Sequence, residues 1–355
     1  MPDTITPDSN AARATSQAGT WLLYGAAGYT GALIARHACE RGHRPVLADR
    51  TAPAVAALAG RLDLPHRAVA LDDPAALTAA LAGVDLVLNA AGPFLHTAGP
   101  LAEACLAAGV HYLDIGNELQ VFSTLYDLDH HARQAGVTIM PGVGFGVVAT
   151  NCLARHVSDT VGGAAILEIA TRAAVAQQGP GVAATRQQNM PYGGWIRQAG
   201  HLKPYPLGSG IITITLPDGP CLMMPLPTGD LEAAFQATGA PDITAYGAVP
   251  GVPAAGDPAA GDSQASDPAP PAYRSFGWAR ATGPDGATAT AWLDAGESYA
   301  FTAAASIRAV EETLTRTLPG AVSPAAAFGA DFALTIPGTS RTDTVPAQAP
   351  LAGRP

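Results

Sequence analysis

The chain has 355 residues, of which 48% are apolar and only 14% are charged, and its formal net charge is −10. A chain of this length can bury two cores of ordinary domain size. The acidic balance, with no cluster of Lys or Arg, argues against nucleic acid or an anionic membrane as a partner.

The first half of the chain predicts alternating strands and helices. Residues 1–19 are polar, lack the apolar core of a signal peptide and are expected to be disordered. From Trp21 onward, short apolar runs alternate with helical stretches of about ten residues as far as VTIMPGVG, which ends at Gly144. This alternation implies right-handed crossovers and a parallel sheet. We therefore expect an α/β fold whose first domain, residues 20–146, is a Rossmann-type, doubly wound parallel sheet that binds a dinucleotide.

The pattern changes after Gly146. A helix is followed by a long alternating strand, by the segment GVAATRQQNMPYGGWIRQAG, which begins like a helix, and by shorter strands such as IITITL and CLMMPL. This predicts a second, α+β domain over residues 147–318, built on a mostly antiparallel sheet that serves substrate binding or dimerisation. Within it, residues 250–271 are low-complexity and should form a flexible loop. A helix is expected at about 298–317, and residues 319–355 form a C-terminal segment that ends in a tail.

Three glycines between the first strand and the first helix form a candidate nucleotide loop. Gly25 permits a tight turn, Gly28 lets the backbone approach a phosphate, and Gly31 allows helix and strand to pack closely. Amides at the helix N-terminus would then face a pyrophosphate. The alternative is a turn with no ligand, but the strand–helix–strand context favours dinucleotide binding. The same loop supplies the neighbouring cofactor candidates Ala27, Tyr29 and Thr30.

The end of the second strand carries two residues with opposite preferences. Asp49 lies where a carboxylate would bind the adenosine ribose hydroxyls of NAD and repel the phosphate of NADP. Arg50, next to it, would attract that phosphate. Either NADP(H) or NAD(H) is compatible with this pair.

Small residues after later strands are expected to line the rest of the cofactor path. They let the cofactor backbone pass close to the carboxyl edge of the sheet, although a simple strand-ending turn explains them as well. After the fourth and sixth strands these candidates are Asn89, Ala91, Gly92, Pro93, Gly142, Gly144 and Phe145.

Several motifs resemble one family. YGAAGYTGALIARH, NAAGPFLHTAGPLAEACLAAGVHYLDIGNE and PGVGFGVVATNCLA are similar to the saccharopine dehydrogenase-like oxidoreductases, particularly the short bacterial branch near the trans-acting enoyl reductases. The likeness extends over about residues 20–340. It implies NADP(H) or NAD(H) as cofactor, a second domain whose sheet faces the nicotinamide, and a C-terminal segment that returns toward the first domain. It also implies redox chemistry on C–N or C=C bonds.

The departures from the family pattern concern mainly the substrate half. Asp49 replaces a Gly that the branch commonly places before Arg, and Gly146 and Asn151 replace two acidic residues. Loss of these carboxylates argues against an amino acid held through its ammonium group. A small, largely apolar metabolite of specialised, polyketide- or lipid-like metabolism, free or attached to a carrier, fits better.

Candidate catalytic residues follow the fifth strand. Glu118 is the best acid/base candidate, although a carboxylate that satisfies helix N-terminal amides is an equal alternative. Asn117 and Tyr112 complete the set. Asp114 is expected to bind neighbouring backbone.

Candidate substrate residues are spread over both domains. His96 could donate a proton or be a solvated histidine, and the arginines could bind a substrate anion or form salt bridges at the domain junction. The set comprises His96, Arg172, Arg186, Tyr192, Trp195 and Arg197. No metal is expected, because the four cysteines are widely separated and His130 and His131 diverge on a helix.

Three functions remain open. The first is an NAD(P)H-dependent reductase of a C=C or C=N bond. The second is a cyclase, isomerase or lyase that retains a bound dinucleotide, and the third is a protein that senses the cofactor. With no run of about 18 apolar residues, we expect a soluble cytoplasmic protein with no membrane span, whose second domain is a candidate for pairing in a homodimer.

Overall fold

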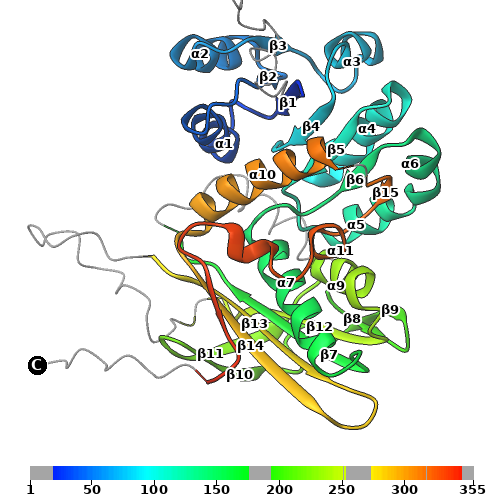
Figure 1. The fold of residues 1–355 in the computed structure, drawn as a ribbon, viewed down its shortest axis with the longest axis vertical. Coiled ribbons are helices and arrows are strands. Elements are labelled where there is room, and N and C mark those ends of the chain that lie inside the picture. The colour runs from blue at the N-terminus through cyan, green and yellow to red at the C-terminus, as the bar shows by residue number, and fades with distance from the viewer. Residues whose placement is uncertain (1–18, 176–192, 251, 253–272, 317, 346–355) are drawn as a thin grey trace, which may run out of the picture.

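The computed structural model describes residues 19–175, 193–250, 252, 273–316 and 318–345. Within them the chain forms two sheets, one of seven strands and one of nine, with helices packed around both (Figure 1). The predicted disordered N-terminus, except Gly19, nearly all of the predicted loop at 250–271, and the candidates Arg186 and Tyr192 lie outside the described residues. None of the described helices is long and apolar enough to cross a membrane.

The first sheet is entirely parallel, which confirms the predicted fold class. Leu22 of β1 lies beside Val46 of β2 on one side and Val87 of β4 on the other. The strand order is β15-β6-β5-β4-β1-β2-β3. The bounds are β1 (Trp21–Tyr24), β2 (Val46–Asp49), β3 (His66–Ala68), β4 (Leu86–Asn89), β5 (His111–Asp114), β6 (Thr138–Met140) and β15 (Gly320–Ala321).

Helices cover both faces of this sheet. Successive residues of a strand point to opposite faces, and Leu22 and Leu23 accordingly belong to different apolar cores. On the face of Leu23 lie α1 (Tyr29–Glu40), α2 (Ala52–Leu62) and α10 (Ser298–Thr315). On the face of Leu22 lie α3 (Pro74–Leu81), α4 (Phe94–Ala108), α5 (Leu119–Tyr126) and α6 (Asp129–Ala135).

The segment 122–136, predicted as one helix, is divided between α5 and α6. The chain turns at Asp127 and Leu128, and α6 begins at Asp129. The Asp129 carboxylate accepts a hydrogen bond from the Ala321 amide at 2.9 Å, so the start of α6 is bound to β15. This long-range contact has no signature in the local sequence.

The second sheet is mostly antiparallel, as predicted, with one parallel pair of strands. Its central strand β7 (Ile166–Arg172) pairs parallel with β12 (Asp242–Ala248) and antiparallel with β13 (Ser275–Thr282). α7 (Phe145–Thr160) and α9 (Asp230–Thr238) pack on one face (Figure 1). The segment at residues 181–200 was expected to begin as a helix, and its described part, from residue 193 onward, contains the strand β8. The remaining strands are β8 (Gly194–Gln198), β9 (His201–Tyr205), β10 (Ile212–Leu216), β11 (Gly219–Pro225), β14 (Thr288–Ala295) and β16 (Ser340–Thr342).

The C-terminal part of the chain joins the two halves. The predicted helix at about 298–317 is α10, which lies between the two sheets and packs against both α1 and α7 (Figure 1). The chain then adds β15 to the edge of the first sheet, beside β6. Two short helices follow, α11 (Pro324–Phe328) and the 3-10 helix η2 (Phe332–Thr335), before β16 completes the second sheet.

Candidate functional site

The glycine loop packs directly on the end of β4. Gly25 has φ +78°, and a Cβ atom there would lie 2.6 Å from the Ala91 nitrogen. A Cβ atom on Gly31 would overlap the Gly25 carbonyl oxygen. Gly28 is the N-cap of α1 and, having no side chain, leaves the first-turn amides without an N-cap acceptor. The loop therefore has the close approach and the helix N-terminus that bind a pyrophosphate.

Asp49 is held at the end of β2 by backbone amides. Its Oδ2 accepts from Ala27 of the glycine loop at 3.3 Å, and its Oδ1 accepts from Thr51 at 2.9 Å. Arg50 is exposed to solvent. The carboxylate is thus fixed beside the loop, whereas the guanidinium is not.

Asp114 is a fully buried carboxylate at the end of β5. It accepts hydrogen bonds from the Tyr112 hydroxyl at 2.9 Å, the Gly116 amide at 2.9 Å and the Gly142 amide at 3.0 Å. Burial raises the pKa of Asp114 to about 6, against the opposing effect of these hydrogen bonds. Asp114 therefore joins the loops that follow β5 and β6.

Glu118 acts on the neighbouring loops in the same way. This side chain is only 2% exposed, and its two oxygens accept from the Phe94 amide at 3.1 Å and the Asn117 amide at 3.0 Å. A Cβ atom on Gly116 would lie 3.2 Å from Asp114 Oδ1 and 3.3 Å from Glu118 Oε2, so both carboxylates converge on this glycine. Together they hold four backbone amides after β4, β5 and β6, which favours a positioning role for Glu118 over proton transfer.

Asn117 connects the two domains. Its side-chain Nδ2 donates to Asp230 at the start of α9 at 3.1 Å. Its backbone carbonyl oxygen accepts from the Gly229 amide at 3.0 Å. Thr150 of α7 donates a hydrogen bond to the same Asp230. Burial raises the pKa of this carboxyl group. A Cβ atom at Gly146 would lie 3.1 Å from Asn117 Nδ2. Gly146, a departure from the family pattern, therefore leaves room for the Asn117 side chain.

Three further polar candidates lie in the interior. The Tyr112 hydroxyl accepts from Asn89 Nδ2 at 3.1 Å besides donating to Asp114, and Asn89 Oδ1 accepts from the Ala91 amide at 2.9 Å. Asn151 donates to the Ala233 carbonyl at 2.9 Å and accepts from the Ala325 amide at 2.7 Å. All three side chains hold neighbouring structure in place.

The described arginine candidates are engaged in ion pairs within the second domain, whereas the alternative weighed from the sequence was salt bridges at the domain junction. Arg197 pairs with Glu232 at 2.6 Å and lies 3.9 Å from the centre of the Phe235 ring. Arg172 pairs with Asp218 and lies over Phe276. By contrast, His96, in the first turn of α4, is exposed to solvent, and Trp195 is half-buried in β8.

Sequence reasoning missed the contribution of α10. Tyr299, in its first turn, packs edge-on against Tyr29 of the glycine loop with ring centroids 5.0 Å apart. Thr302 Oγ1 accepts from the Phe145 amide at 3.1 Å and lies beside Gly144. α10 thus contacts the N-termini of both α1 and α7. No local motif marks these residues, because their partners are far away in the sequence.

Fold and loop together define a class of protein. A glycine loop at the carboxyl edge of a parallel sheet, with a second sheet domain attached, is the architecture of nicotinamide-dinucleotide-binding dehydrogenases. Among the described residues no cluster of His, Cys, Asp or Glu is suited to a metal ion.

Comparison with known proteins supports the family resemblance seen in the sequence. Residues 21–140 match the family described as the saccharopine dehydrogenase NADP binding domain. This part of the chain is therefore similar to the nicotinamide-dinucleotide-binding domain of that family.

Similar proteins agree with this assignment. A trans-acting enoyl reductase from Mycobacterium ulcerans is 29% identical over 143 residues, 38% of this chain and 34% of that protein. One from Mycobacterium tuberculosis is 33% identical over 132 residues, 35% of this chain and 32% of that protein. The match thus spans about a third of these relatives' length. Saccharopine dehydrogenase (L-Glu forming) from Saccharomyces cerevisiae shares the fold, with a TM-score of 0.63 at 12% identity over 91% of this chain and all of that one.

Proposed function

We propose that the protein is an NAD(P)H-dependent reductase of a C=C or C=N bond in a small, largely apolar metabolite. The observation that carries this proposal is the use of the ionisable groups at the carboxyl edge. Asp114 and Glu118 are buried and hold backbone amides, and Asn117 is bonded to Asp230. These groups shape the loops and are not available to bind an ionic substrate.

The exposed side chains around the loops have a different character. The side chains of Tyr29 and Leu95 are 38% and 39% exposed, which are large exposed fractions for an aromatic and an aliphatic side chain. His96 follows Leu95 in the chain. An apolar substrate can pack on such groups, while Tyr29 and His96 carry protons for the carbon or nitrogen that does not receive the hydride. Enoyl reduction, the activity for which the mycobacterial relatives are named, supports the C=C acceptor. A carrier-bound acyl chain is within this substrate class.

For the cofactor, we propose a preference for NAD(H) over NADP(H). Asp49 is fixed by two backbone amides at the end of β2, which supports the expectation that its charge opposes a 2′-phosphate on the adenosine ribose. Arg50 is exposed and has to compete with that repulsion. When bound, the dinucleotide supplies the hydride. The protein contributes the glycine loop, the α1 N-terminus and the orientation of the loops after β4, β5 and β6.

A fluorescence titration with NADH and NADPH tests the first step. Saturable, exchangeable binding with NADH at least about tenfold tighter supports both the dinucleotide site and the role of Asp49. Absence of binding to either form would refute the proposal.

A second experiment tests hydride transfer. The protein is incubated with NADH deuterated at C4 and a panel of medium-chain 2-enoyl thioesters and cyclic imines, and products are analysed by mass spectrometry. We expect deuterium in a reduced product. A tightly held cofactor that never exchanges, with no net oxidation, would instead support a cyclase, isomerase or lyase that retains its dinucleotide.

A further inference from the structure

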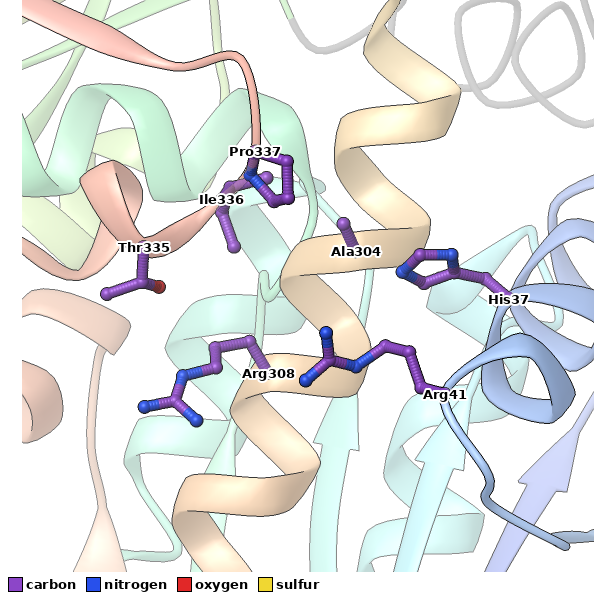
Figure 2. A pocket seen from close by; sticks show the side chains of 7 residues that line it. All are labelled: His37, Arg41, Ala304, Arg308, Thr335, Ile336 and Pro337. Carbon is purple, nitrogen blue, oxygen red and sulfur yellow. The ribbon is translucent and has the colours of Figure 1, made fainter.

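A pocket lies at the far end of α1 from the glycine loop. Its volume is about 290 Å³, and three parts of the chain line it. His37 and Arg41 come from the C-terminal end of α1, Ala304 and Arg308 from α10, and residues 335–337 from the C-terminal segment (Figure 2). Arg41 follows Tyr29 by a helical length of about 18 Å, so this pocket is separate from the dinucleotide loop.

A buried carboxylate organises the cations of this pocket. Arg41 donates from Nε and Nη2 to Glu311 at 2.7 to 3.1 Å, His43 contacts the same carboxylate at 3.0 Å, and Arg308 contacts it at 3.3 Å. Burial acts to raise the pKa of Glu311, but the hydrogen bonds from His43 and Arg41 act in the opposite direction. The pKa of Glu311 is therefore below its usual value. Glu311 therefore fixes the guanidinium group of Arg41, and Glu311 and Glu312 together fix that of Arg308, before any ligand arrives.

The depths of these groups favour an incoming anion. The Glu311 side chain is 19% exposed, whereas those of Arg41 and Arg308 are 43% and 37% exposed. The guanidinium groups are thus more accessible to solvent than the carboxylate that orients them. Each guanidinium has five N–H donors, and Nη1 of Arg41 is outside the ion pair with Glu311. Ordered arginines with remaining donors suit bidentate binding of a phosphate or carboxylate.

The other walls of the pocket are apolar. Ile336 and Pro337 face Ala304 across it, and the Thr335 side chain lies at the same side as Ile336 (Figure 2). This gives one cationic end and one apolar side within a small volume.

We propose that this pocket binds a small organic anion, a phosphate monoester or carboxylate with a short apolar body, through Arg41 and Arg308. His37 lines the same pocket from α1, and its Nδ1 lies 3.3 Å from the Glu40 carboxylate. The ligand joins α1, α10 and the C-terminal segment, three parts of the chain that otherwise meet only through their own side chains at this point.

Calorimetric titration of the full chain, saturated with NADH, tests this proposal with butyl phosphate, valerate and inorganic phosphate. We expect one saturable site with a Kd in about the millimolar range and tighter binding of butyl phosphate than of inorganic phosphate. Comparison of butyl phosphate with valerate identifies the preferred anionic group. Arg41→Gln and Arg308→Gln should each weaken binding about tenfold or more. Arg155→Gln is the matched control, because Arg155 pairs with Asp159 within α7 and does not line the pocket, and it should bind normally.

Hydrogen exchange of the unaltered protein gives an independent result in case a variant folds poorly. Butyl phosphate should protect the C-terminal end of α1 and residues 335–337. Protection confined to residues 25–31 would show an anion in the dinucleotide loop and would overturn the proposal. Absence of saturable binding, or equal binding by the Arg41 and Arg308 variants, would overturn it as well. None of these readouts depends on reductase activity.

Discussion

Tyr299 packs edge-on against Tyr29 although the two residues belong to helices at opposite ends of the chain. Tyr29 opens α1 directly after the glycine loop, and Tyr299 lies in the first turn of α10. The contact joins the dinucleotide loop to a helix that also packs on α7 of the second domain. Cofactor binding and the arrangement of the two domains are therefore physically linked at this pair.

Replacing Tyr299 tests this link. Tyr299→Ala removes the ring contact, and an aromatic pair is worth about 1 kcal/mol, so NADH affinity should fall about fivefold. Tyr299→Phe keeps the ring and is the matched control, with near-normal affinity expected. Fluorescence titration measures both variants. Unchanged affinity in Tyr299→Ala would show that the pair does not support the cofactor loop.

Asp49 should determine cofactor preference. Asp49→Ser removes the charge that opposes the 2′-phosphate while keeping a hydrogen-bonding group, so the ratio of NADPH to NADH affinity should rise about tenfold or more. Adding Arg50→Gln to Asp49→Ser should weaken NADPH again and leave NADH unchanged. An unaltered ratio in Asp49→Ser would show that the carboxylate does not contact the ribose.

Glu118 should act on stability and loop geometry. In Glu118→Gln an amide NH₂ group replaces one of the two oxygens that accept from Phe94 and Asn117, leaving a buried backbone N–H without its acceptor. The free energy of unfolding should fall by about 2 kcal/mol in chemical denaturation. Glu103→Gln, at an exposed position of α4, should change it by less than about 0.5 kcal/mol. Normal stability with abolished turnover and an altered pH–rate profile would instead assign proton transfer to Glu118.

Asp114 should make stability depend on pH in the acid range. Its pKa is raised to about 6 in the folded protein and returns near 3.8 on unfolding, so the folded state binds the proton more tightly. The stabilising contribution is therefore fully present below about pH 4 and is lost as pH rises through about 6. The difference in unfolding free energy between the natural protein and Asp114→Asn should fall by about 2 kcal/mol between about pH 4 and about pH 6.

Denaturation curves at pH 4, 5, 6 and 7 measure this difference. Other buried carboxyls, such as Asp230, titrate in both proteins, so their effects cancel. A difference that does not change with pH would mean that Asp114 is ionised throughout, with an ordinary pKa.

Local sequence patterns predicted the elements of the first domain because each is defined by neighbours in the chain. Alternating apolar runs identified β1 to β6, and the glycine spacing identified the turn that packs on Ala91. The same local logic predicted α10 to within about two residues at its C-terminal end. Where a distant residue decides the structure, the pattern failed, as at the break between α5 and α6.

The sequence by itself determined the parallel sheet, the glycine loop and the resemblance to a family, since these depend on short-range periodicity and on backbone conformations that only glycine adopts easily. The tertiary structure alone decided what the polar candidates do. It buried Glu118 against two amides, paired Arg197 with Glu232, and brought Tyr299 to Tyr29. A carboxylate, a guanidinium or a ring has the same letter whether it faces solvent or a partner, and only folding determines which partner it meets.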